Sequence, residues 1–403
     1  MNKFVPMSKA EMQEQGFEQA DFILVSGDAY IDHPSFGAAI IARTLERFNY
    51  KVAIIAQPNM NNDKDFFKLG TPRLGFLVTS GNIDSMVNHY TVAKKRRGSD
   101  AYTPGGRNDL RPDRATIKYS KKLRSLFGNI PIIIGGIEAS LRRLAHYDYW
   151  SDEVRRSILL DSGADLLVFG MAEKTIVDVA DALEAGLSVE DIIYIRNTVW
   201  KTKDSSRVPS DAIVLPEYDE IISNKMAYIK SFQIQYKKTD AFKAKPIVEH
   251  YQRHIVIQNP PEFPLSEREM DEVYDYPFTR EAHPSYKEHI PAINEVQFSL
   301  IANRGCFGGC NFCALSFHQG RMIQTRSKSS LMKEAEAIIN HKDFKGYIHD
   351  VGGPTANFYQ KSCKKQDKVG VCTHKECIGY DPCDQLDVSH ARYLDVLKSL
   401  RAL

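Results

Sequence analysis

Short apolar runs alternate with helical segments over the first half of the chain, and this alternation restricts the fold more than any other feature. Such an order is expected of a doubly wound parallel sheet with helices on both faces. The segments Phe36–Phe48 and Lys174–Ala185 carry apolar residues at helical spacing. Five runs are predicted to be buried strands: Phe22–Ser26, Val52–Ala56, Leu74–Thr79, Pro131–Ile134 and Leu166–Gly170. We therefore predict a doubly wound α/β domain over residues 1–213.

The composition is typical of a soluble globular protein with more than one domain, because 403 residues exceed an ordinary single core. A net charge of +2 gives no general attraction to nucleic acid or to an anionic membrane. The first residues are polar, and no apolar run approaches the roughly 20 residues of a membrane span. We expect a cytoplasmic protein without a membrane partner.

A polar stretch from Asp84 to Arg114 is long for a connection inside a domain, and long loops are often functional. Its basic run Lys94–Arg97 could bind phosphate, although a solvated surface is the simpler interpretation. Other polar residues follow a predicted strand end, where they could face a substrate or be merely solvated. These residues are Glu138, Arg142, Arg143, His146 and Asp148.

The rest of the chain divides into two regions. Residues 214–291 are rich in proline, tyrosine and charge, and we expect a connector with limited structure and a short strand at Ile255–Ile257. Residues 292–403 show a strand, helix, strand order that predicts the start of a parallel α/β barrel. Its predicted elements are Val296–Ala302, Ser327–Ile339 and Gly346–Val351. The residues after Cys306 leave room for about three strand-and-helix units, so we expect an incomplete barrel.

All seven cysteines lie between Cys306 and Cys383, a distribution that favours metal ligands over a disulfide framework. Cys306, Cys310 and Cys313 have the spacing C-x3-C-x2-C in a loop with two glycines. Three thiolates leave one iron of a four-iron cluster without a cysteine, and that iron can bind a substrate. A structural zinc site with His318 as fourth ligand is the alternative.

The segments RGCFGGCNFCALSFHQGRMIQTRS and HDVGGPTANFY closely resemble the uncharacterised YgiQ family of radical SAM proteins, and the resemblance spans nearly the whole chain. It implies a [4Fe-4S] cluster on the three cysteines whose open iron binds S-adenosylmethionine. It also implies that an electron, from a donor such as flavodoxin or ferredoxin, releases a 5′-deoxyadenosyl radical that takes hydrogen from an unidentified substrate.

The same resemblance assigns residues around S-adenosylmethionine. The backbone near Phe312 is expected to contact the adenine, and Gly352 and Gly353 are expected to meet the methionyl amino group. Pro354 stands where the family commonly has glutamate, so the backbone role carries over and the carboxylate role does not.

Radical SAM proteins often place a cobalamin-binding sheet before the barrel, and IIIGGIEAS and ADLLVFGMAE resemble strand ends of that group. The histidine motif D-x-H-x-x-G is not met, because Asp32, His33 and Gly37 have other spacings. Cobalamin could therefore bind only without histidine ligation. We expect a flavodoxin-like, cobalamin-binding-like fold, and a fold that is kept without the cofactor is favoured over one that binds cobalamin in this way.

A second cysteine group follows the two glycines: Cys363, Cys372, Cys377 and Cys383. Four soft ligands could hold zinc or a second iron–sulfur cluster, or they could be free thiols. Two alternatives to a radical SAM enzyme of unknown substrate stay open at this stage. One is a non-catalytic zinc or iron–sulfur module, which has no need for the Gly-Gly segment, and the other is a radical SAM enzyme that modifies RNA.

Overall fold

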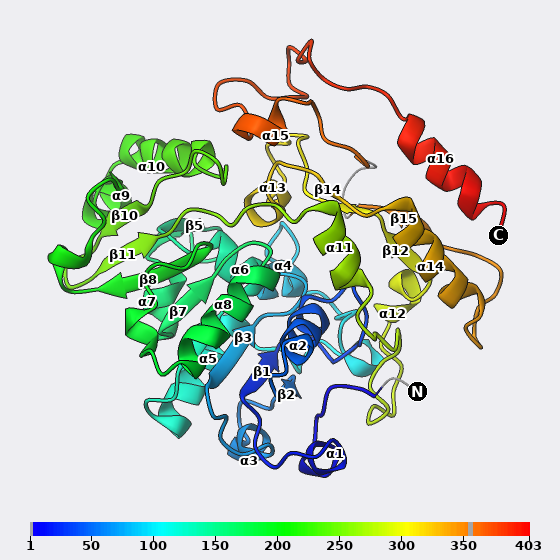
Figure 1. Cartoon of the computed structure of the whole chain (residues 1–403). Helices are drawn as coiled ribbons and strands as arrows, with labels where there is room; N and C mark the ends of the chain where they lie inside the picture. The colour runs from blue at the N-terminus through cyan, green and yellow to red at the C-terminus, as the bar shows by residue number, and fades with distance from the viewer. Residues whose placement is uncertain (1–2, 354–357) are drawn as a thin grey trace.

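The structure, a computed structural model, describes residues 3–353 and 358–403. A nine-stranded sheet forms its centre, with the order β2-β1-β3-β4-β7-β8-β11-β10-β9 (Figure 1). The first five of these strands are mutually parallel: β1 Phe22–Ser26, β2 Val52–Ala56, β3 Gly75–Thr79, β4 Ile132–Ile134 and β7 Leu166–Val168. All five predicted strands are therefore present, because continuous apolar runs suit strands that are buried on both faces.

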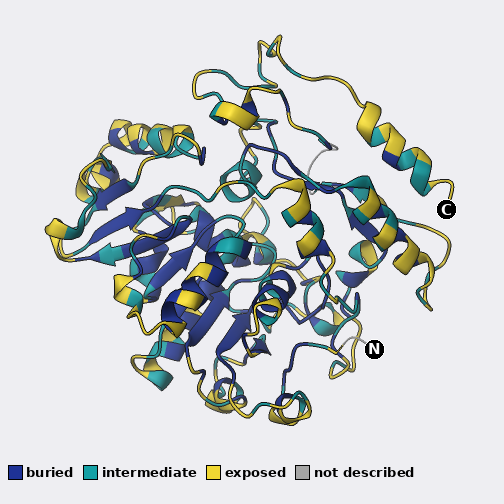
Figure 2. Ribbon diagram, viewed as in Figure 1, coloured by how far each residue is buried: buried dark blue, intermediate teal, exposed yellow. Residues whose placement is uncertain are grey.

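Helices cover both faces of this sheet, so alternate residues of each strand enter different cores. Phe22 and Leu24 of β1 pack in one core, whereas Ile23 and Val25 pack in the other. Helices α2 (Gly37–Arg47) and α8 (Glu173–Glu184) lie side by side over the first core. Helices α5 (Ala115–Phe127) and α7 (Ile158–Ser162) cover the second. The strands are the most buried part of the molecule (Figure 2).

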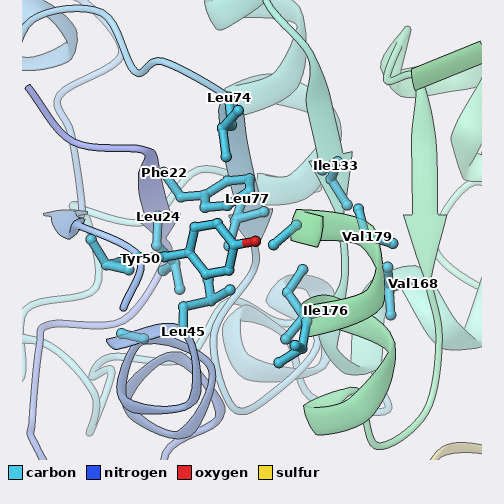
Figure 3. Close-up of a cluster of buried hydrophobic side chains, with 14 of the residues drawn as sticks. Phe22, Leu24, Leu45, Tyr50, Leu74, Leu77, Ile133, Val168, Ile176 and Val179 are labelled. Carbon is cyan, nitrogen blue, oxygen red and sulfur yellow. The ribbon is translucent and has the colours of Figure 1, made fainter. Parts of the chain in front are cut away.

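The core beneath α2 and α8 contains one tyrosine whose hydroxyl is satisfied by an acid. The ring of Tyr50 packs among Phe22, Leu24 and Leu45 (Figure 3). Its hydroxyl donates a hydrogen bond of 2.5 Å to Asp181 on α8. A buried phenol usually finds such a partner, and this one ties α8 to the chain that enters β2 (Val52–Ala56).

The sheet continues through three strands that the sequence pattern did not indicate, β8 Thr198–Thr202, β9 Ile213–Val214 and β10 Ile247–His250. It also contains β11 Ile255–Gln258, which confirms the short strand predicted at Ile255–Ile257. Of these, β8 pairs antiparallel with β7, and β11 pairs antiparallel with both β8 and β10. The helices α9 Tyr218–Ser223, α10 Lys225–Lys237 and α11 Glu267–Tyr274 also fall in the region that we expected to be a connector. Residues 214–291 thus have more structure than expected, while the proposed boundaries at 213 and 291 stay predictions.

The third region holds one parallel strand, helix, strand unit. Strand β12 (Ser299–Ile301) pairs parallel with β15 (Asp350–Gly352), and α14 (Lys328–Ile339) packs against β12. Ser327 caps α14 by accepting a hydrogen bond from the Ser330 amide. Helix α12 (Ile293–Val296) takes the start of the predicted strand Val296–Ala302, and β15 begins later than the predicted Gly346. A further helix, α16 (Ala391–Leu400), packs on α14.

Short elements complete the described chain. The helices are α1 Lys9–Glu14, α3 Asp63–Phe67, α4 Ser85–His89, α6 Gly136–Leu141, α13 Leu315–Gln319 and α15 Gln366–Val369, and the strands are β5 His146–Asp148, β6 Glu153–Arg155, β13 Asn303–Arg304 and β14 Gln324–Thr325. No helix among the described residues combines the length and apolar character needed to span a bilayer.

Candidate functional site

The predicted cluster loop begins where β13 ends. Gly305 has a φ of +87°, and a Cβ at this position would lie 2.1 Å from the carbonyl oxygen of Met322. Only glycine therefore fits where the two sides of the loop approach each other. The amide of Cys306 donates to the carbonyl oxygen of Gly320 at 3.1 Å, which closes the base of the loop. The close approach and this hydrogen bond fix where the loop starts and ends.

The room between the thiols depends on a second glycine. A Cβ on Gly308 would lie 3.3 Å from Sγ of Cys306 and 3.7 Å from Sγ of Cys310, so a side chain there would fill the space beside both sulfurs. The Cys313 amide donates to the Cys310 carbonyl at 3.0 Å and turns the chain after the second cysteine. Cys310 is exposed, while Cys306 and Cys313 are half-buried. The three thiols are thus accessible on a loop that leaves room for a group between them.

The thiols do not have the close packing of a zinc site. Zinc holds thiolates at about 2.3 Å, which places tetrahedral sulfurs about 3.8 Å apart. Among the described residues, three potential ligand atoms come within 4.8 Å of one another only at Glu281, His341 and Asp343, and no cysteine is among them. A four-iron cluster separates its cysteine ligands further, because each sulfur binds a different iron.

The Gly-Gly segment lies directly beside this loop. In the parallel pair of β12 and β15, the Ala302 amide donates to the Gly352 carbonyl at 2.7 Å. A Cβ on Gly353 would lie 2.5 Å from Nδ2 of Asn303, so backbone and side chain are already in contact there. Because Asn303 precedes Cys306 by three residues, the structure brings Gly352 and Gly353 to the base of the cysteine loop. Pro354 lies outside the described residues.

Two phenylalanines of the loop behave differently. Phe307 is buried, and its ring stacks on Phe358 with centroids 4.0 Å apart and planes 18° from parallel. Phe312 is 93% exposed and extends away from the protein. The contact between the backbone near Phe312 and adenine stays a prediction, and the exposed ring leaves that face of the loop open.

A cavity of about 910 Å³ lies between the large sheet and the region of the chain that contains the cysteines. One wall is formed by segments that follow parallel strands, including Gly81 after β3, Gly135 after β4 and Gly170 after β7. The opposite wall includes Gly352 and Gly353. The cavity therefore lies at the carboxyl ends of the strands, where open α/β sheets bind ligands.

His318 projects into this cavity in a neutral form. Nδ1 of His318 lies 3.0 Å from the Ser140 hydroxyl oxygen, which also hydrogen-bonds the Gly136 carbonyl at 2.9 Å. Burial lowers the pKa of His318 to about 4. The imidazole is therefore neutral at pH 7, and Ser140 of α6 holds the ring. His318 is not close enough to the cysteines to share a metal ion with them.

A buried ion pair connects the sheet domain to the cluster loop. Arg304 of β13 pairs with Glu173, the first residue of α8, and both side chains are almost fully buried. Nε of Arg304 also donates to the hydroxyl of Tyr274 at 2.9 Å. Burial disfavours the charged guanidinium, but Glu173 and Tyr274 outweigh this cost and raise the pKa of Arg304. Glu173 belongs to the sheet domain, Tyr274 to residues 214–291 and Arg304 to the cysteine region. These three regions of the chain therefore contact one another at Arg304, two residues before Cys306.

The family model described as Radical SAM N-terminal matches residues 4–299. The chain belongs to the Radical SAM N-terminal family. This membership confirms the resemblance to radical SAM proteins and places the chain in that superfamily of enzymes.

Relatives of this family member are similar over nearly all of the chain. A UPF0313 protein of Clostridium botulinum (strain ATCC 19397 / Type A) is 54% identical over 402 residues, which cover 99% of this chain and 62% of the relative. A UPF0313 protein of Clostridium perfringens (strain 13 / Type A) is 52% identical over 404 residues, covering 100% and 61%. The relatives' names are consistent with the YgiQ type. The chain spans about three fifths of their length.

Two solved structures of the radical SAM methyltransferase TsrM from Kitasatospora setae are similar at low identity. The one with tryptophan substrate and a SAM analogue bound has a TM-score of 0.43 at 14% identity, covering 79% of this chain and 45% of TsrM. The one with cobalamin and a [4Fe-4S] cluster bound has a TM-score of 0.42 at 14% identity, covering 79% and 46%.

The polar residues after β4 are engaged within the sheet domain of this Radical SAM N-terminal protein. The Glu138 carboxylate accepts hydrogen bonds from Ser85 and from the Thr116 amide.

The charged residues that follow Glu138 also have partners in the fold. Arg142 pairs with Asp84, and Arg143 donates to Gln258 at 2.7 Å. Asp148 pairs with Arg114, and Nδ1 of His146 lies 3.1 Å from the Leu144 carbonyl. These partners account for the residues as parts of the fold, so a role toward a substrate stays a prediction.

Asn303 is a site residue that the sequence interpretation missed. Its side chain is fully buried, and among the described residues neither its Oδ1 nor its Nδ2 has a hydrogen-bond partner, although it touches Gly353. An unpaired buried amide is costly and is expected where a ligand completes its bonds. The only signal was its position shortly before Cys306, and the sequence could not reveal the contact with a glycine 50 residues later.

The second cysteine group is only partly gathered. Sγ of Cys377 lies 3.4 Å from the hydroxyl oxygen of Ser362, the neighbour of Cys363, and the Cys383 amide donates to the Cys377 carbonyl at 3.2 Å. Burial raises the pKa of the Cys377 thiol, and the nearby thiols of Cys363 and Cys383 add to this rise. Cys372 is held separately, through its carbonyl, by Arg321 at 3.2 Å.

Proposed function

We propose that this chain binds a [4Fe-4S] cluster through Cys306, Cys310 and Cys313 and cleaves S-adenosylmethionine reductively. One observation carries the proposal: the parallel pairing of β12 with β15 sets the Gly352-Gly353 backbone beside the base of the cysteine loop. A metal module has no use for this arrangement. A cofactor that must contact both the cysteine loop and the Gly352-Gly353 backbone explains why the two lie side by side.

The residues present fit such a cluster. The loop supplies three thiols, and Gly308 leaves the space between two of them free. His318, which could have closed a zinc tetrahedron, is held by Ser140 instead. When bound, the cluster would supply an electron from a donor such as flavodoxin or ferredoxin and an open iron for the methionyl end of S-adenosylmethionine.

The protein's own groups then hold the cofactor in place. The backbone at Gly352 and Gly353 would hydrogen-bond the methionyl amino group. The Asn303 amide, which has no partner among the described residues, would complete its bonds to the same ligand. Backbone near Phe312 would bind the adenine on the exposed side of the loop. Asn303 thus offers a polar anchor in a family member that has Pro354 in place of a glutamate.

We further propose that the cavity of about 910 Å³ receives the substrate. The volume suits a small organic molecule, and Gly353 on its wall connects it with the cofactor position. The parallel strands have the order 2-1-3-4-5, which supports a flavodoxin-like domain. His33 is fully buried, and its Nδ1 accepts the Ser35 amide at 3.0 Å, so the domain does not offer it as a cobalamin ligand. We therefore favour a fold that works without histidine-ligated cobalamin.

The test is the formation of 5′-deoxyadenosine. The chain is reconstituted anaerobically with iron and sulfide, reduced with dithionite and mixed with S-adenosylmethionine, and the products are separated by chromatography. Cys310→Ala removes one ligand, and Asn311→Ala, at the exposed neighbouring position, is the matched control. The proposal predicts product with the wild type and with Asn311→Ala but none with Cys310→Ala. A fully loaded wild-type cluster that gives no product contradicts it for this chain.

A further inference from the structure

The segment from residue 361 to residue 390 lacks the means to fold by burial alone. Its one regular element is the four-residue helix α15, and Val371 is its one buried apolar side chain. Ile378, Tyr380 and Val388 are exposed, and most of the segment is exposed or half-buried (Figure 2). Segments that cannot build a core are commonly held by a bound metal or by disulfides.

Contacts inside this segment nevertheless draw three of its four cysteines together. Cys377 donates its thiol hydrogen to Ser362, whose neighbour in the chain is Cys363. The backbone of Cys383 hydrogen-bonds the backbone of Cys377 at 3.2 Å, and the Asp387 amide donates to the Ser362 carbonyl at 2.7 Å. The loop therefore folds back on itself around its sulfur atoms, although apolar contacts do not require this.

The same segment is attached to the first cysteine loop. A Cβ on Gly309 would lie 2.9 Å from the Glu376 carboxylate, so Glu376 packs directly on that loop. The Tyr236 hydroxyl donates to the same carboxylate at 2.7 Å, and Arg321 binds the Cys372 carbonyl. The two cysteine groups are thus neighbours, and the contacts between them come from residues adjacent to the cysteines.

We propose that Cys363, Cys372, Cys377 and Cys383 hold a second [4Fe-4S] cluster beside the first. Four thiolates complete the ligand set of a cubane, so this centre has no open iron and plays a different part from the first. The spacings of eight, four and five residues lack the tight C-x2-C pairs of zinc ribbons. No three of these sulfurs lie within 4.8 Å of one another, whereas the thiolates of a zinc tetrahedron are about 3.8 Å apart.

Iron and sulfide analysis of the reconstituted chain tests this proposal. The wild type is expected to bind about eight irons, and the variant Cys363→Ser/Cys377→Ser about four. The variant Cys306→Ser/Cys310→Ser/Cys313→Ser should also retain about four. The matched control Lys364→Ser/Ile378→Ser alters the exposed neighbours of two cysteines and should retain about eight.

The outcomes separate this proposal from the first. About four irons in the wild type, unchanged by Cys363→Ser/Cys377→Ser, overturn the second cluster and leave the first in place. One zinc per chain that is lost with the same variant also overturns it. Irons that survive the triple substitution and disappear with Cys363→Ser/Cys377→Ser support the second cluster even if the first cannot form. The four irons that the double variant keeps show that it still folds.

Discussion

Replacing Glu173 by glutamine should destabilise the protein much more than its conservative shape suggests. The Glu173 carboxylate and the Arg304 guanidinium are 6% and 3% exposed, so water cannot take over the lost interaction. Within the described part of the chain Nη2 of Arg304 already has no partner, and after the change the Tyr274 hydroxyl would be the remaining side-chain partner of a buried charge. Removing one member of a buried ion pair costs about 3–5 kcal/mol, and we expect a loss of about 3 kcal/mol because glutamine keeps the shape.

The neighbouring residue provides the control. Lys174 pairs with Glu269 at 2.6 Å, but both side chains are about one third exposed. Exposed pairs contribute under about 1 kcal/mol, so Lys174→Gln should have little effect. The free energy of unfolding is measured for both variants from urea titrations followed by circular dichroism. Equal losses for Glu173→Gln and Lys174→Gln would refute the idea that this pair joins the sheet domain to the cluster loop.

Three further predictions concern the loop and the cavity. Gly308→Ala should lower severalfold the iron bound by Cys306, Cys310 and Cys313, because its Cβ enters the space beside two thiols. Iron analysis in the Cys363→Ser/Cys377→Ser background measures this, and an unchanged iron content would contradict it. The pKa of His318 is about 4 in the folded chain against an ordinary value of 6.5. Its contribution to the stability of the folded chain is therefore fully present above about pH 6.5 and is lost as the pH falls toward 4. His318→Gln should reduce the fall in the free energy of unfolding between these pH values by about 3 kcal/mol, and a variant profile parallel to that of the wild type would contradict this. Gly136→Ala should lower the free energy of unfolding by at least about 1 kcal/mol, because Gly136 has a φ of +82° and a Cβ there would lie 2.4 Å from a threonine hydroxyl. Urea titrations measure this loss, and wild-type stability in the variant would show that the turn adapts.

The parallel half of the sheet could be predicted because each of its strands is a continuous apolar run. Runs such as Phe22–Ser26 are buried on both faces, and burial on both faces leaves a clear pattern. The strand Thr198–Thr202 was missed because it contains two apolar residues, Val199 and Trp200, flanked by threonine and lysine, which is too short an apolar run to indicate a strand. It becomes a strand through antiparallel hydrogen bonds to β7 and β11, which are interactions with distant parts of the chain.

The candidate site was predictable only where its members are close in sequence. The spacing of Cys306, Cys310 and Cys313 and the glycine pair after a strand both follow from local patterns. The contact of His318 with Ser140 joins residues 178 positions apart, and no local pattern encodes it. The cavity, likewise, is made by strand ends and loops that meet only in the folded chain.

The most direct test of the central claim is the electron paramagnetic resonance spectrum of the reduced first cluster, recorded with and without S-adenosylmethionine. The background Cys363→Ser/Cys377→Ser keeps the second cysteine group from contributing. Because the three cysteines leave one iron open, binding of S-adenosylmethionine should change the spectrum, and Gly353→Val, which projects a side chain at the Gly-Gly segment, should weaken that change. A cluster whose spectrum is the same with and without S-adenosylmethionine would contradict the account.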